Sequence, residues 1–204
     1  FTEQETAVLR RPAAQIYATD RVEVWRGSRG VARTAFAAHT YDEAHKRLGA
    51  HPRLVEPVMD LLGGEVYMHQ YKINAKAAFD GEVWQWHQDF GTWHRDDGMP
   101  EPKAMNIALF LDEVTPANGP TVILPGSHQR NCPTDRMGGT MTYRDQVVLT
   151  GPPGSVAFAH YDIWHSATPN TGTTPRHMLK FLFSRKSEPT GPSWASTPES
   201  RVIA

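Results

Sequence analysis

The pattern of hydrophobic and polar positions changes near residue 65 of the chain. Before this point apolar residues recur with the spacing of amphipathic helices, and after it short runs alternate or are rich in β-branched and aromatic residues. The pattern predicts helices over residues 3–18, 41–48 and 52–62, the last ending at Gly63-Gly64, where glycine readily adopts a left-handed cap. It predicts strands over residues 65–75, 83–89, 105–111, 121–124, 145–149, 155–159 and 177–184.

Many short strands separated by turn residues predict a β-sandwich or barrel, with the early helices packed outside it. A length of 204 residues suits one domain, and glycine and proline are spread along the chain instead of forming a linker. We therefore expect a single domain over residues 1–204, mainly β with flanking helices. Its helical N-terminal part covers about residues 1–64 and its β-core about residues 65–186.

Composition and charge exclude several classes of protein. The formal net charge of -1 gives no basic footprint for nucleic acid. No apolar stretch approaches the ~20 residues of a membrane-spanning helix, and the single cysteine, Cys132, excludes an internal disulfide. We expect a cytoplasmic protein whose partner is a small-molecule substrate, with no nucleic acid and no membrane; the sequence leaves the oligomeric state open.

The densest group of chemically active residues is the stretch WHQDFGTWH, residues 86–94. In an extended strand His87 and Asp89 project from one face, whereas Trp86 points the other way, into the core. His165 follows far downstream at a strand boundary. Two imidazoles and a carboxylate on one face of an octahedral ion suit non-haem Fe(II), and zinc also fits this ligand list. A His-x-Asp triplet alone is a weak signal, so its context has to decide.

Arg176 opens a largely apolar predicted strand, eleven residues after His165. A buried guanidinium needs an acidic partner, and its fork matches a carboxylate in two-point fashion. A dicarboxylate co-substrate meets that need. A surface arginine at the start of a strand explains the position alone, but not its order after His87, Asp89 and His165.

With these residues in place, the chain resembles the phytanoyl-CoA dioxygenase superfamily of Fe(II)/2-oxoglutarate oxygenases. The similarity is greatest to the branch with ectoine hydroxylase and bacterial proline trans-4-hydroxylases. The matching blocks are residues 66–76, 86–93, 96–100, 118–120 and 125–128, and the resemblance runs from about residue 51 to residue 185. Ordered blocks of this length are far more specific than one triplet.

The resemblance implies a double-stranded β-helix, a jelly-roll, cupin-like fold whose open mouth holds the iron. It implies that His87, Asp89 and His165 bind the metal and that Arg176 binds the far carboxylate of 2-oxoglutarate. Asn74 falls where relatives hold this co-substrate.

Relatives often read His-Gly-Ser where this chain reads His165-Ser166-Ala167-Thr168. The hydroxyl beside the co-substrate is therefore assigned to Thr168 or to Ser166.

Further candidates would contact the substrate. The resemblance assigns Gln70, Thr92 and Trp93 to this role. Strand alternation places Gln70, Lys72 and Asn74 on one face, and it places Asn106 on the face of its strand that is shared with Ala108. Lys72, Gln70 and Asn106 are the candidates for the carboxylate or amine of a substrate, although each is also explained as an exposed or locally satisfied side chain.

The resemblance implies a hydroxylase that uses Fe(II), 2-oxoglutarate and O2 and releases succinate and CO2. The expected substrate is small and amino-acid-like, such as proline, a ring homologue or ectoine. Halogenases of the superfamily carry a small residue at the position of Asp89. Because this chain keeps the acid, the resemblance favours hydroxylation. Two alternatives stay open: the same cofactor chemistry on a larger natural-product intermediate, with hydroxylation, desaturation or ring formation, and a non-catalytic jelly-roll binding protein.

Overall fold

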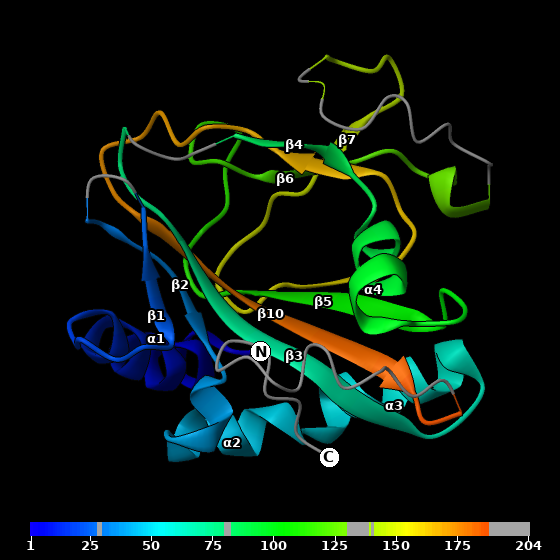
Figure 1. Cartoon of the computed structure of the whole chain (residues 1–204). Coiled ribbons are helices and arrows are strands. Elements are labelled where there is room, and N and C mark those ends of the chain that lie inside the picture. Colours follow the sequence, from blue (N-terminus) through cyan, green and yellow to red (C-terminus); the bar gives the residue numbers. More distant parts are fainter. Residues whose placement is uncertain (28–29, 80–82, 130–138, 140, 188–204) are drawn as a thin grey trace.

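The fold is built from two antiparallel β-sheets that face each other (Figure 1). The computed structural model describes residues 1–27, 30–79, 83–129, 139 and 141–187, so Cys132 lies outside the described residues. The larger sheet has the strand order β1-β2-β3-β10-β5-β8, and the smaller sheet has the order β4-β9-β6-β7. This arrangement agrees with the expected jelly-roll class.

The elements have the following bounds. The helices are α1 (Glu3–Tyr17), α2 (Glu43–Gly49), α3 (Pro52–Leu62) and α4 (Asp89–Asp97). The strands of the larger sheet are β1 (Val24–Arg26), β2 (Ala32–Phe36), β3 (Val66–Lys76), β5 (Ala104–Phe110), β8 (Val156–His160) and β10 (Arg176–Arg185). Those of the smaller sheet are β4 (Trp84–His87), β6 (Thr121–Ile123), β7 (Val147–Val148) and β9 (His165–Ala167).

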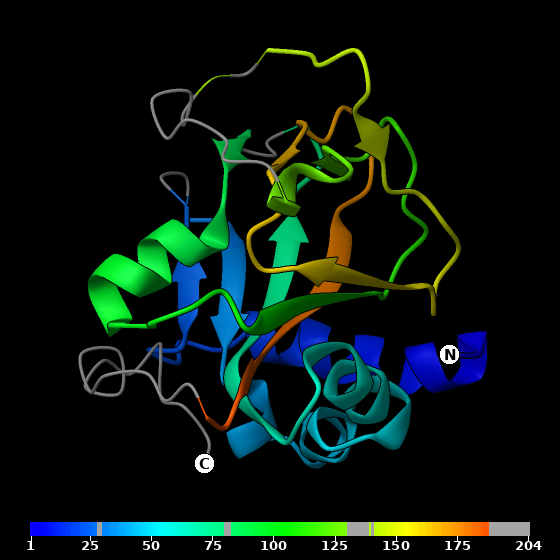
Figure 2. The ribbon, with the colours of Figure 1, turned by 90° about the vertical axis from the view of Figure 1, so that its right-hand side faces the viewer.

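Local signals fix the ends of the N-terminal helices. Thr2 caps α1, and its side chain and that of Glu5 form a reciprocal capping box. Gly63, with φ +69°, ends α3 at the predicted position. These helices cover the outer face of the larger sheet (Figure 2). No described helix has the length and apolar character needed to span a bilayer.

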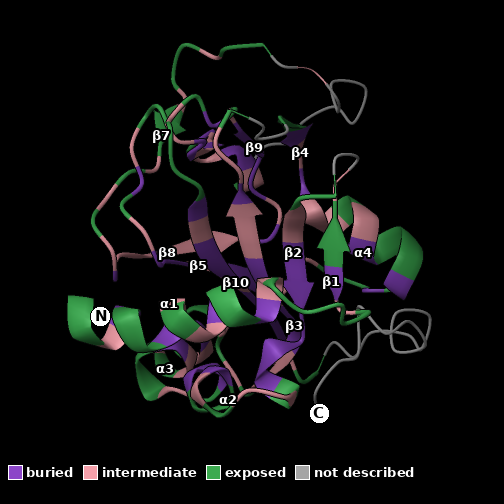
Figure 3. Ribbon diagram, turned by 90° about the vertical axis from the view of Figure 1, so that its left-hand side faces the viewer, coloured by how far each residue is buried: buried purple, intermediate pink, exposed green. Residues whose placement is uncertain are grey.

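The larger sheet has one apolar face and one polar face. Residues that alternate along β3, β5 and β10, among them Ile73, Ile107 and Leu179, are fully buried against α1, α2 and α3. Burial of each such side chain contributes roughly 2 kcal/mol. Lys72 and Lys180, one residue out of phase, point to the space between the sheets. The purple segments of these strands in Figure 3 are the buried residues of this core.

Two parts of the chain differ from the predicted elements. The N-terminal part, predicted as helical, also contains β1 and β2, which pair with each other and extend the larger sheet at β3. The predicted strand over residues 83–89 ends at His87, and α4 begins at Asp89. Gln88 is still extended, with φ -116° and ψ 132°, so it carries the chain from the strand into the helix. Trp86 is buried, as predicted.

Two buried histidines make the stability of the fold depend on pH. Burial lowers the pKa of His39 and of His45 to about 4. His39 stacks on Tyr71, and the Nδ1 atom of His45 lies 2.6 Å from the Tyr71 hydroxyl. Protonation of either imidazole favours the unfolded chain, where the pKa is about 6.5. The stabilising contribution is therefore complete above pH 6.5 and is lost as the pH falls toward 4.

We expect the free energy of unfolding to fall between pH 7 and pH 5 by about 2 kcal/mol for each of these histidines. The variant His39→Phe should remove one contribution and flatten the dependence, as measured by urea unfolding at both pH values. The control Val8→Phe, at an exposed position of α1, introduces the same side chain without removing an imidazole and should leave the dependence unchanged. An unaltered slope in His39→Phe would contradict the assignment.

Candidate metal centre and co-substrate cavity

Three separate elements bring His87, Asp89 and His165 together between the sheets. His87 ends β4, His165 begins β9, and the two residues are register partners across these antiparallel strands. Asp89 is the first residue of α4. One ligand atom from each of the three lies within 4.8 Å of the others. The structure therefore assembles the predicted triad, although Asp89 reaches it from a helix and not from a strand.

Hydrogen bonds orient both imidazoles. The Nδ1 atom of His87 lies 2.7 Å from the carbonyl oxygen of Gln85, and the Nδ1 atom of His165 lies 3.0 Å from that of Ile163. Donation from Nδ1 leaves Nε2 as the free lone pair of each ring. Both Nε2 atoms lie 3.6 Å from a carboxylate oxygen of Asp89.

The protonation states suit cation binding. Burial lowers the pKa of His165 to about 4, which keeps its imidazole neutral at pH 7. Burial also opposes ionisation of Asp89, but His165, His87 and Lys180 outweigh it and hold the pKa of this carboxyl well below its usual value. The start of a helix also favours a negative charge. An anionic oxygen and two neutral nitrogens are the donors that a divalent transition metal requires.

Asn106 contacts the triad directly. Its side-chain nitrogen donates a hydrogen bond of 2.5 Å to Oδ2 of Asp89. Asn106 lies on β5, opposite Leu182 of β10, so the rigid larger sheet holds the carboxylate in place. The substrate contact that the sequence suggested for Asn106 stays a prediction; the structure adds a hydrogen bond to Asp89, and Asn106 also lines the cavity beside the triad.

A cavity of about 90 Å³ extends from the triad toward Arg176 at the start of β10. Arg176 is 3% exposed, and its guanidinium donates to the carbonyl oxygens of Asn118 and Gly119. Gly119 has φ +80°, and a Cβ there would lie 3.1 Å from the carbonyl oxygen of Thr168, which explains why the loop needs glycine. Burial lowers the pKa of Arg176 to about 10. No acidic residue forms an ion pair with it within the described part of the chain.

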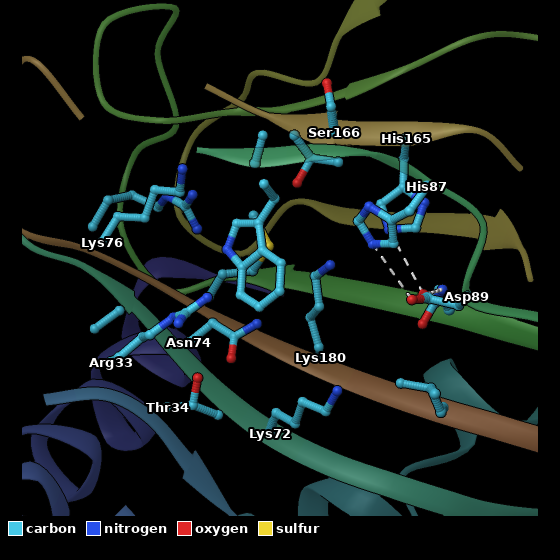
Figure 4. Close-up of a pocket in the computed structure, with 18 residues that line it drawn as sticks. Arg33, Thr34, Lys72, Asn74, Lys76, His87, Asp89, His165, Ser166 and Lys180 are labelled. Atoms are coloured by element: carbon cyan, nitrogen blue, oxygen red, sulfur yellow. Dashed lines mark hydrogen bonds and ion pairs between the residues drawn. The ribbon is translucent and has the colours of Figure 1, made fainter. Parts of the chain in front are cut away.

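Two of the three predicted co-substrate residues, Asn74, Ser166 and Thr168, line the cavity. Asn74 lines the cavity, and its buried Oδ1 has no hydrogen-bond partner among the described residues. Ser166 also lines it, but Figure 4 shows its hydroxyl directed away from Asp89 (Figure 4). Thr168 does not line the cavity; its carbonyl oxygen accepts a hydrogen bond from Lys76, and its buried hydroxyl has no partner among the described residues.

The predicted substrate residues divide in the same way. Thr92 and Trp93 of α4 line a wider cleft of about 710 Å³ that adjoins the triad at His87 and Asp89. Lys72 lines both this cleft and the inner cavity. Gln70 lines neither; it is 4% exposed, and its side-chain amide has no hydrogen-bond partner in the described residues.

Sequence reasoning missed Lys180. This residue lines the inner cavity from β10, on the same face as Arg176, four residues earlier. In Figure 4 its side chain rises into the space between Asn74 and the triad (Figure 4). The alternation that placed Lys72 beside Asn74 would have placed Lys180 in the cavity with Arg176.

Known proteins share this fold and much of this sequence. An L-proline trans-4-hydroxylase from Streptomyces griseoviridis is 37% identical over 183 residues, which cover 75% of this chain and 67% of that enzyme. An ectoine dioxygenase from Halomonas elongata is 41% identical over 177 residues, which cover 76% of this chain and 53% of that enzyme. The chain thus spans about half to two thirds of the length of these two relatives.

Solved structures agree with the sequence comparison. EctD from S. alaskensis with bound Fe matches with a TM-score of 0.83 and 30% identity, over 99% of this chain and 76% of that one. EctD with 2-oxoglutarate and 5-hydroxyectoine matches with a TM-score of 0.82 and 30% identity, over 92% and 70% of the two chains. This likeness confirms the predicted jelly-roll class.

A family model covers most of the chain as well. The model of phytanoyl-CoA dioxygenase (PhyH) matches residues 2–178. Together with the relatives above 30% identity, this match confirms the resemblance seen in the sequence: the chain belongs to the phytanoyl-CoA dioxygenase family.

Proposed function

We propose that this protein is an Fe(II)- and 2-oxoglutarate-dependent oxygenase that hydroxylates a C–H bond of a small, amino-acid-like molecule. The observation that carries the proposal is the convergence of His87, Asp89 and His165 in one cavity with the buried Arg176. Iron with 2-oxoglutarate and O2 supplies the oxidising chemistry, and the products are succinate, CO2 and the hydroxylated substrate. Relatives named for action on proline and on ectoine support a small substrate.

The donor set fits iron. His87 and His165 present Nε2 atoms whose lone pairs are free when Nδ1 donates to a carbonyl oxygen, and Asp89 offers an ionised oxygen between them. Two imidazoles and one carboxylate on one side of an octahedral ion leave three positions open for a bidentate oxo-acid and O2. A structural zinc site instead closes its tetrahedron with four protein ligands, and only these three residues converge within the described part of the chain.

The surroundings of Arg176 fit a dicarboxylate. Its guanidinium is buried, and its hydrogen bonds to described residues go to carbonyl oxygens. The charge of Asp112 acts on it without forming an ion pair, and it lines the same cavity as the triad. A buried cation without an acid is costly, and a carboxylate held by both arms of the fork removes that cost. The role of Arg176 in this proposal is to orient the far end of 2-oxoglutarate while its oxo-acid end points to His87 and Asp89.

The other predicted contacts follow the two cavities. Asn74 offers a buried, unpartnered carbonyl oxygen on the co-substrate side. Thr92, Trp93 and Lys72 line the wider cleft, where the substrate would enter. The proposed roles of Gln70, Ser166 and Thr168 stay predictions, as does a cytoplasmic location. The shared core of helices and larger sheet supports one domain.

The first test is substrate-stimulated release of succinate. Protein loaded anaerobically with Fe(II) and 2-oxoglutarate, then exposed to air with a panel of free amino and imino acids, should release succinate in proportion to hydroxylated product. Asp89→Ala should reduce this activity by at least about 100-fold, because it removes the anionic ligand. The control Asp96→Ala changes an exposed carboxylate on the same helix and should keep activity. Stimulation only by bulky molecules would contradict the small substrate, and no stimulation across broad panels would contradict the enzyme.

A second test concerns Asn106. Loss of its hydrogen bond to Asp89 should weaken metal binding by about 10- to 100-fold, because outer partners fix the orientation of metal ligands. The measurement is anaerobic titration of Asn106→Ala with Fe(II), followed by calorimetry. Gln15→Ala, at an exposed position of α1, is the control and should bind as the unaltered protein does. Equal affinities for all three proteins would show that Asn106 does not support the metal.

A third test separates the co-substrate from the metal. Arg176→Met should raise the KM for 2-oxoglutarate by about 100-fold, because it removes a charge-assisted bidentate contact. The Kd for Fe(II) should change by less than about threefold, since Arg176 forms no part of the triad. Arg47→Met, an exposed arginine of α2, should change neither constant. A KM that stays at its original value in Arg176→Met would remove Arg176 from the proposal.

A further inference from the structure

Two lysines face each other across the polar face of the larger sheet. Lys180 of β10 and Lys72 of β3 are register partners on neighbouring antiparallel strands, and both line the inner cavity. Like charges directly opposite each other on one face of a sheet are destabilising. Neither ammonium group forms a hydrogen bond or ion pair with another described residue. The Nζ atom of Lys72 lies 5.5 Å from the ring centre of Trp93 and 5.8 Å from that of Phe36, and these rings offset part of its charge. An anion placed between the two ammonium groups would relieve their remaining repulsion.

The cavity itself does not supply that anion. The other charged residues that line it are Arg33, Lys76, Arg176 and Asp89. Asp89 is the only acid among the described lining residues, and it already accepts a hydrogen bond from Asn106 and faces the two imidazoles. In the proposed function a divalent ion adds two positive charges and 2-oxoglutarate adds two negative ones. The excess positive charge of the lysine pair therefore persists in the loaded enzyme.

The pKa shifts of the two lysines are consistent with the excess of positive charge in the cavity. Burial, opposed by the charge of Asp89 and aided by that of Lys180, lowers the pKa of Lys72 to about 8. Burial likewise lowers the pKa of Lys180, with Asp89 opposing and Arg176 adding to the effect. A carboxylate between the two groups would favour both ammonium forms.

We propose that Lys180, paired with Lys72, binds the carboxylate of the substrate and thereby selects amino or imino acids with a free carboxylate. This inference rests on the proposed function and names the substrate class and the residue that determines it. Anchoring this end of a small molecule beside Asp89 holds its C–H bonds near the metal centre, which is the positioning that a hydroxylase needs.

The near carboxylate of 2-oxoglutarate is the other possible source of the anion. Lys180 lies four residues from Arg176, roughly 13 Å along the strand, whereas 2-oxoglutarate is anchored at Arg176. Lys72 lines the wider cleft together with Thr92 and Trp93. In Figure 4 the side chain of Lys180 rises toward the imidazoles, and that of Lys72 lies below it on the neighbouring strand (Figure 4). Lys72 lines both cavities, whereas Lys180 lines the inner cavity beside it. The position of Lys72 favours the substrate as the source of the anion.

The test compares an acid with its amide. Binding of L-proline and L-prolinamide, and of L-pipecolic acid and its amide, is measured by calorimetry on the anaerobic protein loaded with Fe(II) and 2-oxoglutarate. We expect the unaltered protein to prefer each acid by about 10- to 100-fold. Lys180→Met should lose this preference, Lys180→Arg should keep most of it, and the Kd for 2-oxoglutarate should change by less than about threefold in both. Lys46→Met, an exposed lysine of α2, is the control and should bind as the unaltered protein does.

The outcomes separate this inference from the proposed function. If an acid binds with the expected preference but no succinate is released, the proposed function fails and the lysine pair stands. If Lys180→Met weakens 2-oxoglutarate and leaves the acid unaffected, the pair belongs to the co-substrate and the inference is overturned. Equal binding of acid and amide by the unaltered protein overturns it as well, even when succinate assays identify a substrate.

Discussion

The alternation of side chains along the regularly paired parts of β3, β5 and β10 is the constraint on which the rest of the structure depends. One face of these strands carries Ile73, Ile107 and Leu179, which are excluded from water by the N-terminal helices. The same alternation directs Lys72 and Lys180 to the opposite face. A slip of one residue would bury these charges among the helices and expose the core. The stability of the fold and the chemistry of its cavity are therefore set by one register.

The polar face of the larger sheet surrounds one acidic residue with several cationic side chains. Asp89 stands almost alone among cations, so the carboxylate stays ionised, and the Nε2 atoms of His87 and His165 complete a donor set for a divalent metal. Arg176, at the start of β10, lies in another part of the same cavity. The rigid sheet keeps an anion-binding group at a fixed distance from a cation-binding group, as the proposed use of metal and oxo-diacid together requires.

Much of the fold was predictable from local signals. The caps of α1 and α3 are encoded by neighbouring residues, Thr2 with Glu5 and Gly63, and the alternating strands are visible in the pattern. Helix α4 was missed because its aromatic residues favour strands and Gly91 is a poor helix former. The packing of Trp93 against Met99 and against Tyr161, far along the chain, stabilises the helix in spite of these preferences. The short strands β1 and β2 were missed because they are stabilised by pairing with β3.

The sequence by itself determined the family, the class of fold and the identity of the three candidate ligands, because ordered motifs and alternation are properties of the chain. Only the tertiary structure decided that Asn106 orients Asp89 and that Lys180 opposes Lys72. It also decided that Asp89 starts a helix. These facts depend on which strands pair and in which register, and long-range pairing is set by the packing of the whole core and not by any local segment.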